Sequence, residues 1–173
     1  MMRKLFITLL LVAMGIVGMA QNRIPNSNIS FGFPDGGWKY LRTIDVDQNT
    51  KVYLYCFSGH TVLDAQGDTI LPHMKIYVRR NYTDPLFNLV YSRYEYNPYQ
   101  SLREYTDGLP SPEGIGYVAA YKNMQDNKEY MFNMIYFKDK NTAVEIRIET
   151  TVDTYEDFKD EFEAILNTVS IEK

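Results

Sequence analysis

The 173-residue chain contains few of the residues that mark special structural classes: it has one cysteine, two histidines, 10 glycines and 7 prolines. A disulfide framework needs paired cysteines, and collagen-like or low-complexity chains need an excess of glycine or proline. Motifs for a glycine-rich phosphate loop, a zinc-protease helix, a Cys-x-x-Cys pair and a nucleophile elbow are missing. The composition, 45% hydrophobic and 23% charged, is that of an ordinary globular domain.

Long apolar runs are also missing, apart from one near the N-terminus. Arg3 and Lys4 precede an uncharged stretch from Leu5 to Val17, and small residues follow as far as Ala20. This pattern is typical of a secretory signal peptide, and the run is short for a spanning helix, which takes about 20 apolar residues. A retained helical anchor is the alternative. We expect cleavage after Ala20, a periplasmic or extracellular location, and no stable membrane anchor on the mature protein.

Removal of residues 1–20 leaves residues 21–173, which we interpret as a single domain. Two of the 18 Lys and Arg residues lie in the removed segment, so 16 basic residues face 22 acidic ones and the formal net charge is −6. Nucleic acid is therefore a poor candidate partner, because phosphate binding draws on a basic surface.

Hydrophobic periodicity and turn residues predict mainly strands, with three helices. We interpret the first two strands as a central hairpin, and residues 21–30 as a loose segment before the fold. Residues 168–172 are expected to return to the edge of the sheet. The predicted strands are 39–46, 51–58, 74–80, 116–122, 129–138 and 142–151, with a hairpin turn within 61–71; the predicted helices are 85–95, 98–107 and a last one that begins near residue 153.

The C-terminal part carries the clearest signals. In the arm 142–151, apolar residues alternate with charged ones, which predicts a strand with one buried and one solvated face. The last helix begins with Asp153 or Thr154 as its cap and has an acidic face that we expect to be solvated. Its other face is an apolar stripe formed by Tyr155, Phe158, Phe162, Ile165 and Leu166.

Both ends of the domain resemble the PsbP-like (Mog1/PsbP) family. Those domains begin with a strand that contains a Pro-x-Gly-Trp-like turn, which is similar to Phe31 to Trp38 here, although an extra Gly36–Gly37 pair precedes Trp38. They end with an amphipathic helix and an Ile-Leu-x-Ser/Thr step into a last strand, as from Ile165 to Val169. The resemblance implies an α+β fold, an antiparallel sheet with helices on both faces, and a non-catalytic accessory or binding role.

Residues capable of chemistry are few, since His60 and His73 are the only imidazoles. Cys56 lies in an apolar strand, where we expect it to be buried, with an intermolecular disulfide as the alternative. His60 lies four residues further along the strand, about 13 Å away, which is too far for a nucleophile and its base. The turn Asp64 to Asp68 faintly resembles a calcium loop but lacks the closing Glu, so we interpret it as a hairpin turn. We expect no catalytic residue, metal or cofactor.

The most unusual feature is tyrosine, with 15 copies against one tryptophan. Tyrosine and arginine are enriched at the centres of binding surfaces. From Lys75 to Arg103 there are five basic and two acidic residues, a local excess of positive charge in an acidic domain. The alternative is that these tyrosines pack against the helix faces. The predicted partner surface consists of Arg93, Tyr94, Tyr96, Tyr99, Arg103 and Tyr105.

Together these features predict a secreted, non-catalytic accessory or binding protein of the bacterial cell envelope. Its expected partner is an unidentified protein or an envelope glycan. The rival hypothesis is a small-molecule carrier or hydrolase with a pocket between the sheet and the helices, in which His60 or His73 supplies the imidazole.

Overall fold

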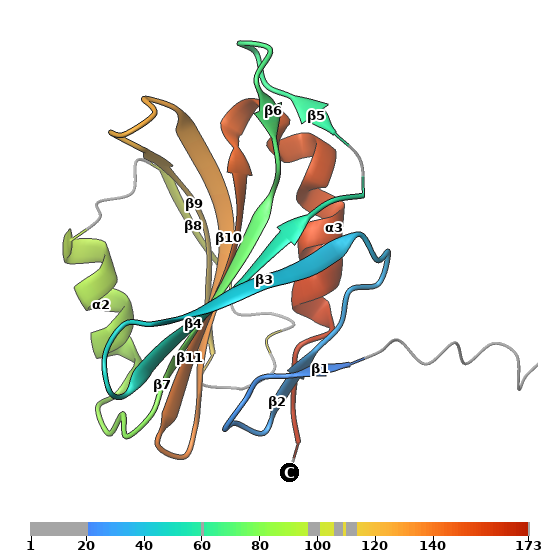
Figure 1. The fold of residues 1–173 in the computed structure, drawn as a ribbon. Coiled ribbons are helices and arrows are strands. Elements are labelled where there is room, and N and C mark those ends of the chain that lie inside the picture. Colours follow the sequence, from blue (N-terminus) through green and yellow to red (C-terminus); the bar gives the residue numbers. More distant parts are fainter. Residues whose placement is uncertain (1–20, 60, 97–100, 106–108, 110–113, 173) are drawn as a thin grey trace, which may run out of the picture.

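A computed structural model describes residues 21–59, 61–96, 101–105, 109 and 114–172. Its main element is a seven-stranded antiparallel sheet in the order β3-β4-β7-β11-β10-β9-β8 (Figure 1). The strands are β3 (Trp38–Asp45), β4 (Thr50–Phe57), β7 (His73–Arg79), β8 (Ser101–Tyr105), β9 (Ile115–Lys122), β10 (Glu129–Asp139) and β11 (Thr142–Thr151).

Two helices cover opposite faces of this sheet (Figure 1). Helix α3 (Tyr155–Asn167) follows a short 3-10 turn, η1 (Val152–Thr154), and packs through the predicted apolar stripe. Helix α2 (Leu86–Tyr96) packs on the other face. Alternation along β10 explains the arrangement: Ile135 and Phe137 belong to the core beneath α3, whereas Met134 and its alternate neighbours belong to the core beneath α2. The expected α+β fold with helices on both faces is confirmed.

Residues before Trp38 form regular structure, so the prediction of a loose segment is wrong. Strand β2 (Ile29–Phe31) pairs with β1 (Asn22–Arg23) on one side and with the last strand, β12 (Ser170–Ile171), on the other, in a separate small sheet. The prediction that residues 168–172 return to the edge of the main sheet is therefore wrong, because β12 pairs with β2 instead. Ile24, Ile29 and Phe31 are all at most 1% exposed, and their burial holds the two chain ends together.

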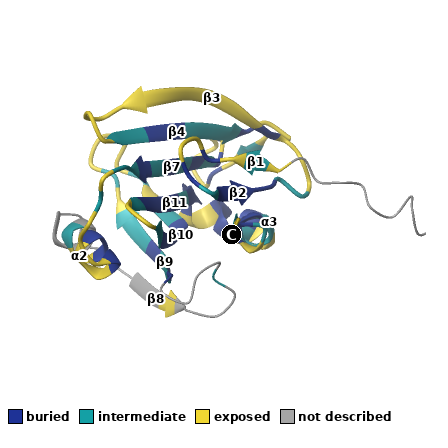
Figure 2. Ribbon diagram, turned by 90° about the horizontal axis from the view of Figure 1, so that it is seen from below, coloured by how far each residue is buried: buried dark blue, intermediate teal, exposed yellow. Residues whose placement is uncertain are grey.

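The hairpin of β3 and β4 lies at the edge of the main sheet, where the sequence predicted a central position. In Figure 2, β3 runs along the sheet edge and is exposed over nearly its whole length. A register shift between Tyr40 and Arg42 interrupts its pairing with β4. Bulges and charged residues of this kind protect open strand edges from pairing with other chains.

Residues 101–105 form strand β8, so the predicted helix over 98–107 is wrong there. Ser101 pairs with Ala120, and Tyr105 pairs with Gly116 on β9. The Asn97-Pro98 start signal is local, whereas pairing with a neighbouring strand supplies backbone hydrogen bonds from outside the segment. Residues 97–100 and 106–108 lie outside the described residues.

The charged face of β11 is buried, although alternation predicted that it would be solvated. Glu145 and Glu149 are 0% and 2% exposed. Glu145 forms ion pairs with Arg79 on β7 at 3.2 Å and with Arg147 at 3.4 Å, and Glu149 is paired with Lys75. Buried charges persist where they are paired, and here the cations come from the neighbouring strand β7 and from β11 itself.

Aromatic side chains connect the main sheet, α3 and the start of the domain. Trp38 stacks on Phe33 with ring centroids 5.7 Å apart, and its indole nitrogen donates to Glu161 of α3 at 2.7 Å. Phe162 of α3 is 0% exposed and contacts both Trp38 and Phe158. The turn before Trp38 thus orients the last helix on the sheet.

The glycine pair in this turn has a steric reason. Gly36 and Gly37 both have positive φ, +70° and +76°. A Cβ on Gly37 would lie 2.6 Å from the ring of the buried Phe57, whereas a Cβ on Gly36 would meet nothing within 4 Å. Gly37 is therefore needed both for its backbone conformation and for close packing. Within the described ranges, no helix is long and apolar enough to cross a membrane.

Truncation of Phe162 to Ala should destabilise the domain by about 3–5 kcal/mol, because it leaves a cavity in the core beneath α3. The matched control is Phe87→Ala on α2, where the ring is 62% exposed; its cost should stay below about 0.5 kcal/mol. Urea unfolding of both variants measures the difference. Equal losses would contradict this account of the core.

Substitution of the two turn glycines by Ala separates backbone strain from packing. Gly36→Ala should cost about 1–2 kcal/mol, because an L-residue is forced into the left-handed region. Gly37→Ala should cost clearly more, since the same strain is combined with a clash against Phe57. Thermal or urea unfolding would show two similar losses if the clash were unimportant.

Candidate functional site

The outward face of α2 carries an exposed aromatic pair. The helix begins after Asp84-Pro85, a start signal that the sequence shows, and it buries Leu86, Leu89 and Val90 against the sheet. Phe87 and Tyr91, on the other face, are 62% and 58% exposed. Residues four apart in a helix are neighbours, and these two rings stack with centroids 6.2 Å apart. We call this pair the α2 aromatic ridge.

The predicted partner surface lies partly on the same helix. Arg93, Tyr94 and Tyr96 belong to the last turns of α2, and Arg103 and Tyr105 belong to β8. Their side chains, and the whole of Tyr99, lie outside the described residues, so this prediction stays untested. The α2 aromatic ridge is not part of the predicted partner surface, although the helical spacing of the buried residues is enough to place Phe87 and Tyr91 on the opposite face.

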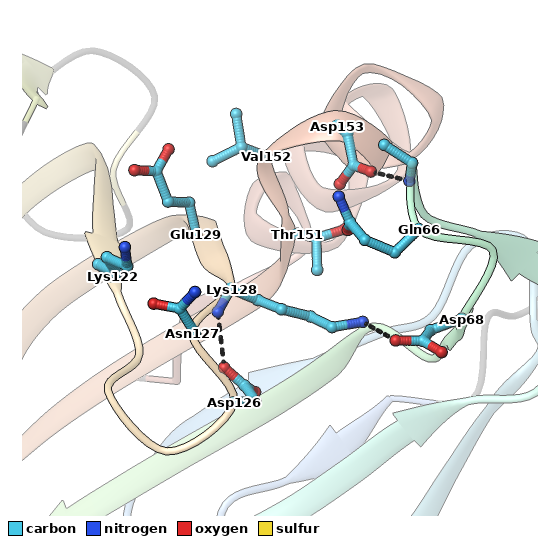
Figure 3. Close-up of a pocket in the computed structure, with 11 residues that line it drawn as sticks. Gln66, Asp68, Lys122, Asp126, Asn127, Lys128, Glu129, Thr151, Val152 and Asp153 are labelled. Carbon is cyan, nitrogen blue, oxygen red and sulfur yellow. Dashed lines mark hydrogen bonds and ion pairs between the residues drawn. The ribbon is translucent and has the colours of Figure 1, made fainter.

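A second feature is a groove of about 590 Å³ at one end of the sheet (Figure 3). The β5–β6 hairpin, formed by β5 (Val62–Leu63) and β6 (Thr69–Ile70), supplies one wall, and the β9–β10 loop supplies another. Lys128 from that loop reaches across to the carboxylates of Asp64 and Asp68. Asp153 in η1, just before α3, accepts a hydrogen bond from the backbone N–H of Ala65. These contacts fasten the hairpin to the body of the domain.

The turn from Asp64 to Asp68 is a hairpin turn, as expected. Asp64 Oδ1 accepts the backbone N–H groups of Gln66 and Asp68 at 3.0 and 2.8 Å. The Lys128 ammonium contacts the other oxygen and lies 2.6 Å from Asp68, so a side-chain cation occupies the space between the carboxylates. This ammonium lowers the pKa of Asp64, and the two carboxylates in turn raise the pKa of Lys128.

The groove is lined by charged side chains but contains no nucleophile and histidine base. Its walls carry the carboxylates of Asp126, Glu129 and Asp153 in addition to Asp68, and the amines of Lys122 and Lys128. None of its 11 lining residues is a histidine, cysteine or serine. In the described ranges, no group of three or more His, Cys, Asp or Glu residues is arranged to hold a metal ion.

Strand register brings Cys56, His73 and Glu149 into one row across β4, β7 and β11. Cys56 is half-buried, so the expectation of full burial is wrong, and its thiol donates to the Phe57 carbonyl at 3.2 Å. Desolvation raises the pKa of the Cys56 thiol and lowers that of His73, although the Glu149 carboxylate opposes the second shift.

The three groups in this row are each engaged with other partners. His73 Nδ1 lies 2.8 Å from the Leu71 carbonyl, and the Glu149 carboxylate is paired with Lys75. With a raised thiol pKa, the row does not favour a thiolate nucleophile. The sequence pointed to His60, which lies outside the described residues. His73 is the other candidate imidazole, but the sequence did not place it beside Cys56, because the cross-strand neighbour of Cys56 depends on register.

The Lys128 contact generates a prediction. Lys128→Met keeps the aliphatic chain but leaves the carboxylate of Asp64 without its cation, so amide exchange across residues 62–70 should accelerate. Because the pKa of Asp64 lies below its ordinary 3.8, the stabilisation is present at neutral pH and is lost as the pH falls through the lowered value. The difference in unfolding midpoint between wild type and variant should therefore disappear in acid. Lys122→Met, on the same groove, is the control, and equal exchange in both variants would contradict the role of Lys128.

Comparison with known proteins shows similarity in fold only. No family model matches the chain, and no curated protein matches its sequence. The crystal structure of LpqN, involved in cell envelope biogenesis of Mycobacterium tuberculosis, matches with 12% identity and a TM-score of 0.50, over 84% of this chain and 83% of LpqN. PA94 of Pseudomonas aeruginosa, a protein of unknown function, matches with 11% identity and a TM-score of 0.51, over 90% of this chain and 98% of PA94.

The solution structure of PsbP from the cyanobacterium Synechocystis sp. PCC 6803 also matches, with 9% identity and a TM-score of 0.47, over 90% of this chain and 95% of PsbP. LpqN and PA94 are Mog1/PsbP-like structures, so the PsbP-like resemblance is confirmed at the level of the fold.

Proposed function

We propose that the protein is an exported, non-catalytic binding protein of the bacterial cell envelope, and that it binds a protein partner through the α2 aromatic ridge. The observation that carries the proposal is the stacked pair of Phe87 and Tyr91, more than half exposed on a helix whose other face is buried. Phe and Tyr each bury 150–250 Å² in a packed environment. Two adjacent rings thus offer a partner a continuous apolar area.

Composition around the ridge supports a binding role. Single exposed apolar residues are normal on protein surfaces, but an adjacent aromatic pair forms a patch. The next two turns of α2 contain Arg93, Tyr94 and Tyr96, residue types that are enriched at the centres of interfaces. Of the basic residues between Lys75 and Arg103, Lys75 and Arg79 are neutralised by Glu149 and Glu145, so it is Arg93 in the sequence of α2 that favours a partner with an acidic surface.

Export is supported by the basic start, the apolar run and the small residues that end at Ala20. A location in the periplasm or outside the cell follows from that export. LpqN, which shares the fold, is involved in cell envelope biogenesis, and this agrees with an envelope role here.

A non-catalytic role is supported by the chemistry of the described side chains. The thiol of Cys56 and the ring of His73 are engaged with backbone carbonyls, and Glu149 is engaged with Lys75. The groove beside Lys128 has the volume of a small-molecule site. However, it lies at the ends of the strands and is not lined by His73, so the rival carrier or hydrolase has less support.

Site-specific crosslinking in the native host tests the proposed docking surface. A photoreactive phenylalanine analogue replaces Phe87 in one strain and Met124 in another. Met124 is a matched control because it is 85% exposed on the β9–β10 loop, at the end of β10 opposite Lys138, which contacts the residues just before α2. We expect a discrete crosslinked protein from position 87 and none from position 124, since only a docked partner lies close enough to react.

Two surface variants complete the test. Phe87→Ser combined with Tyr91→Ser, and separately Ala at Arg93, Tyr94 and Tyr96, should reduce co-purification of the partner identified by crosslinking at least about tenfold, which corresponds to about 1.4 kcal/mol. Circular dichroism and urea unfolding should show an intact fold. Full recovery by both variants would refute the placement on α2, and binding to isolated envelope glycan without any protein crosslink would replace the protein partner by a glycan.

A further inference from the structure

Gln21, the first described residue, carries a side-chain amide that can react with its own α-amine once that amine is free. Gln21 is exposed and directly precedes β1, whose first residue, Asn22, pairs with Phe31. Within the described part of the chain, no hydrogen bond or ion pair engages the Gln21 side chain. Cleavage after Ala20 would therefore place a free α-amine and an unengaged side-chain amide on the same solvent-exposed residue.

We propose that Gln21 of the exported protein is converted to pyroglutamate, an inference that rests on the export step of the proposed function. The α-amino nitrogen attacks Cδ of the side-chain amide, a new C–N bond closes a five-membered lactam, and the original Cδ–NH2 bond breaks. Ammonia leaves with the transferred proton, so the step needs no oxidant, water or co-reactant.

The reactivity of this residue follows from ordinary physical chemistry. An intramolecular reaction between two groups on one residue has a high effective concentration. The attacking amine must be neutral, and α-amino groups have pKa values near 7.7–8.0, so a useful fraction is neutral at neutral pH. Because Gln21 lies outside the strand pairing that starts at Asn22, the ring forms without breaking a strand hydrogen bond.

The lactam would protect β1, which is so short that removal of a few N-terminal residues would eliminate it. Strand β1 is two residues long, and Arg23 donates to the Ser27 carbonyl at 3.2 Å and to Asn28 Oδ1 at 3.1 Å. It also lies 3.7 Å from the carboxylate of Glu172, next to the C-terminal strand. An aminopeptidase that removed three residues would erase β1 and these contacts, and a lactam denies such enzymes the free amine they require.

Mass spectrometry of the full-length gene product, purified after export from its host, tests the proposal. The N-terminal peptide should begin at residue 21 and be lighter than the free-glutamine form by one ammonia. Digestion at mildly acidic pH keeps the amine protonated and prevents cyclisation during handling. The matched variant Gln21→Asn is one methylene shorter and would need a four-membered ring, so its peptide should carry a free amine.

A second readout measures the consequence. On incubation with an aminopeptidase, the wild-type protein should remain intact, whereas Gln21→Asn should lose residues through Arg23. A peptide that begins at residue 21 with a free amine would overturn the modification and leave export standing. A peptide that begins at Met1 or at any other residue would overturn both the cleavage after Ala20 and the modification.

Discussion

The two central strands, β10 and β11, are buried on both faces, and this constraint determines where the other elements lie. Every residue from Phe132 to Phe137 is at most 1% exposed. Because side chains alternate between the faces of a strand, such a segment needs cover on two sides. Helix α3 covers one face and α2 covers part of the other. Strands farther from this centre are less covered, and the edge strand β3 is exposed on seven of its eight residues.

Because the sheet is buried on both faces, its charged residues must be paired with one another. Glu145 and Glu149 lie in the middle of the covered sheet, where an isolated carboxylate would be very costly. Arg79, Arg147 and Lys75 neutralise them from the same strand and its neighbour. The polar Asn133 is accommodated in the same way, since it accepts a hydrogen bond from Tyr155. Groups that have the chemistry of catalytic residues thus have structural partners in this fold.

The surface available for binding consists of side chains that do not pack against the sheet. Helix α2 needs only Leu86, Leu89 and Val90 to attach to the sheet, so Phe87 and Tyr91 contribute little to stability and remain available to a partner. The β5–β6 hairpin packs Val62 against the core beneath α3, and Lys128 and Asp153 add polar contacts that hold it in place. Folding and recognition therefore involve different side chains, even where they share one helix.

The sequence alone was sufficient for elements whose signal is local. The stripe from Tyr155 to Leu166 and the hairpin over 129–151 follow from periodicity within a few turns or a few strand residues, and the observed α3, β10 and β11 match them closely. The start of α2 follows from Asp84-Pro85, and the same spacing places Phe87 and Tyr91 opposite the buried face.

Features that depend on neighbours distant in the chain needed the folded structure. Residues 101–105 follow the helix start signal Asn97-Pro98, yet they form β8 because β9 offers backbone partners. The position of the β3–β4 hairpin at the edge, the burial of Glu145, and the meeting of Cys56 with His73 all depend on strand order and register. Local propensity reports only on adjacent residues, whereas strand order and register are decided by which distant segments together bury the most apolar surface and satisfy the most backbone groups.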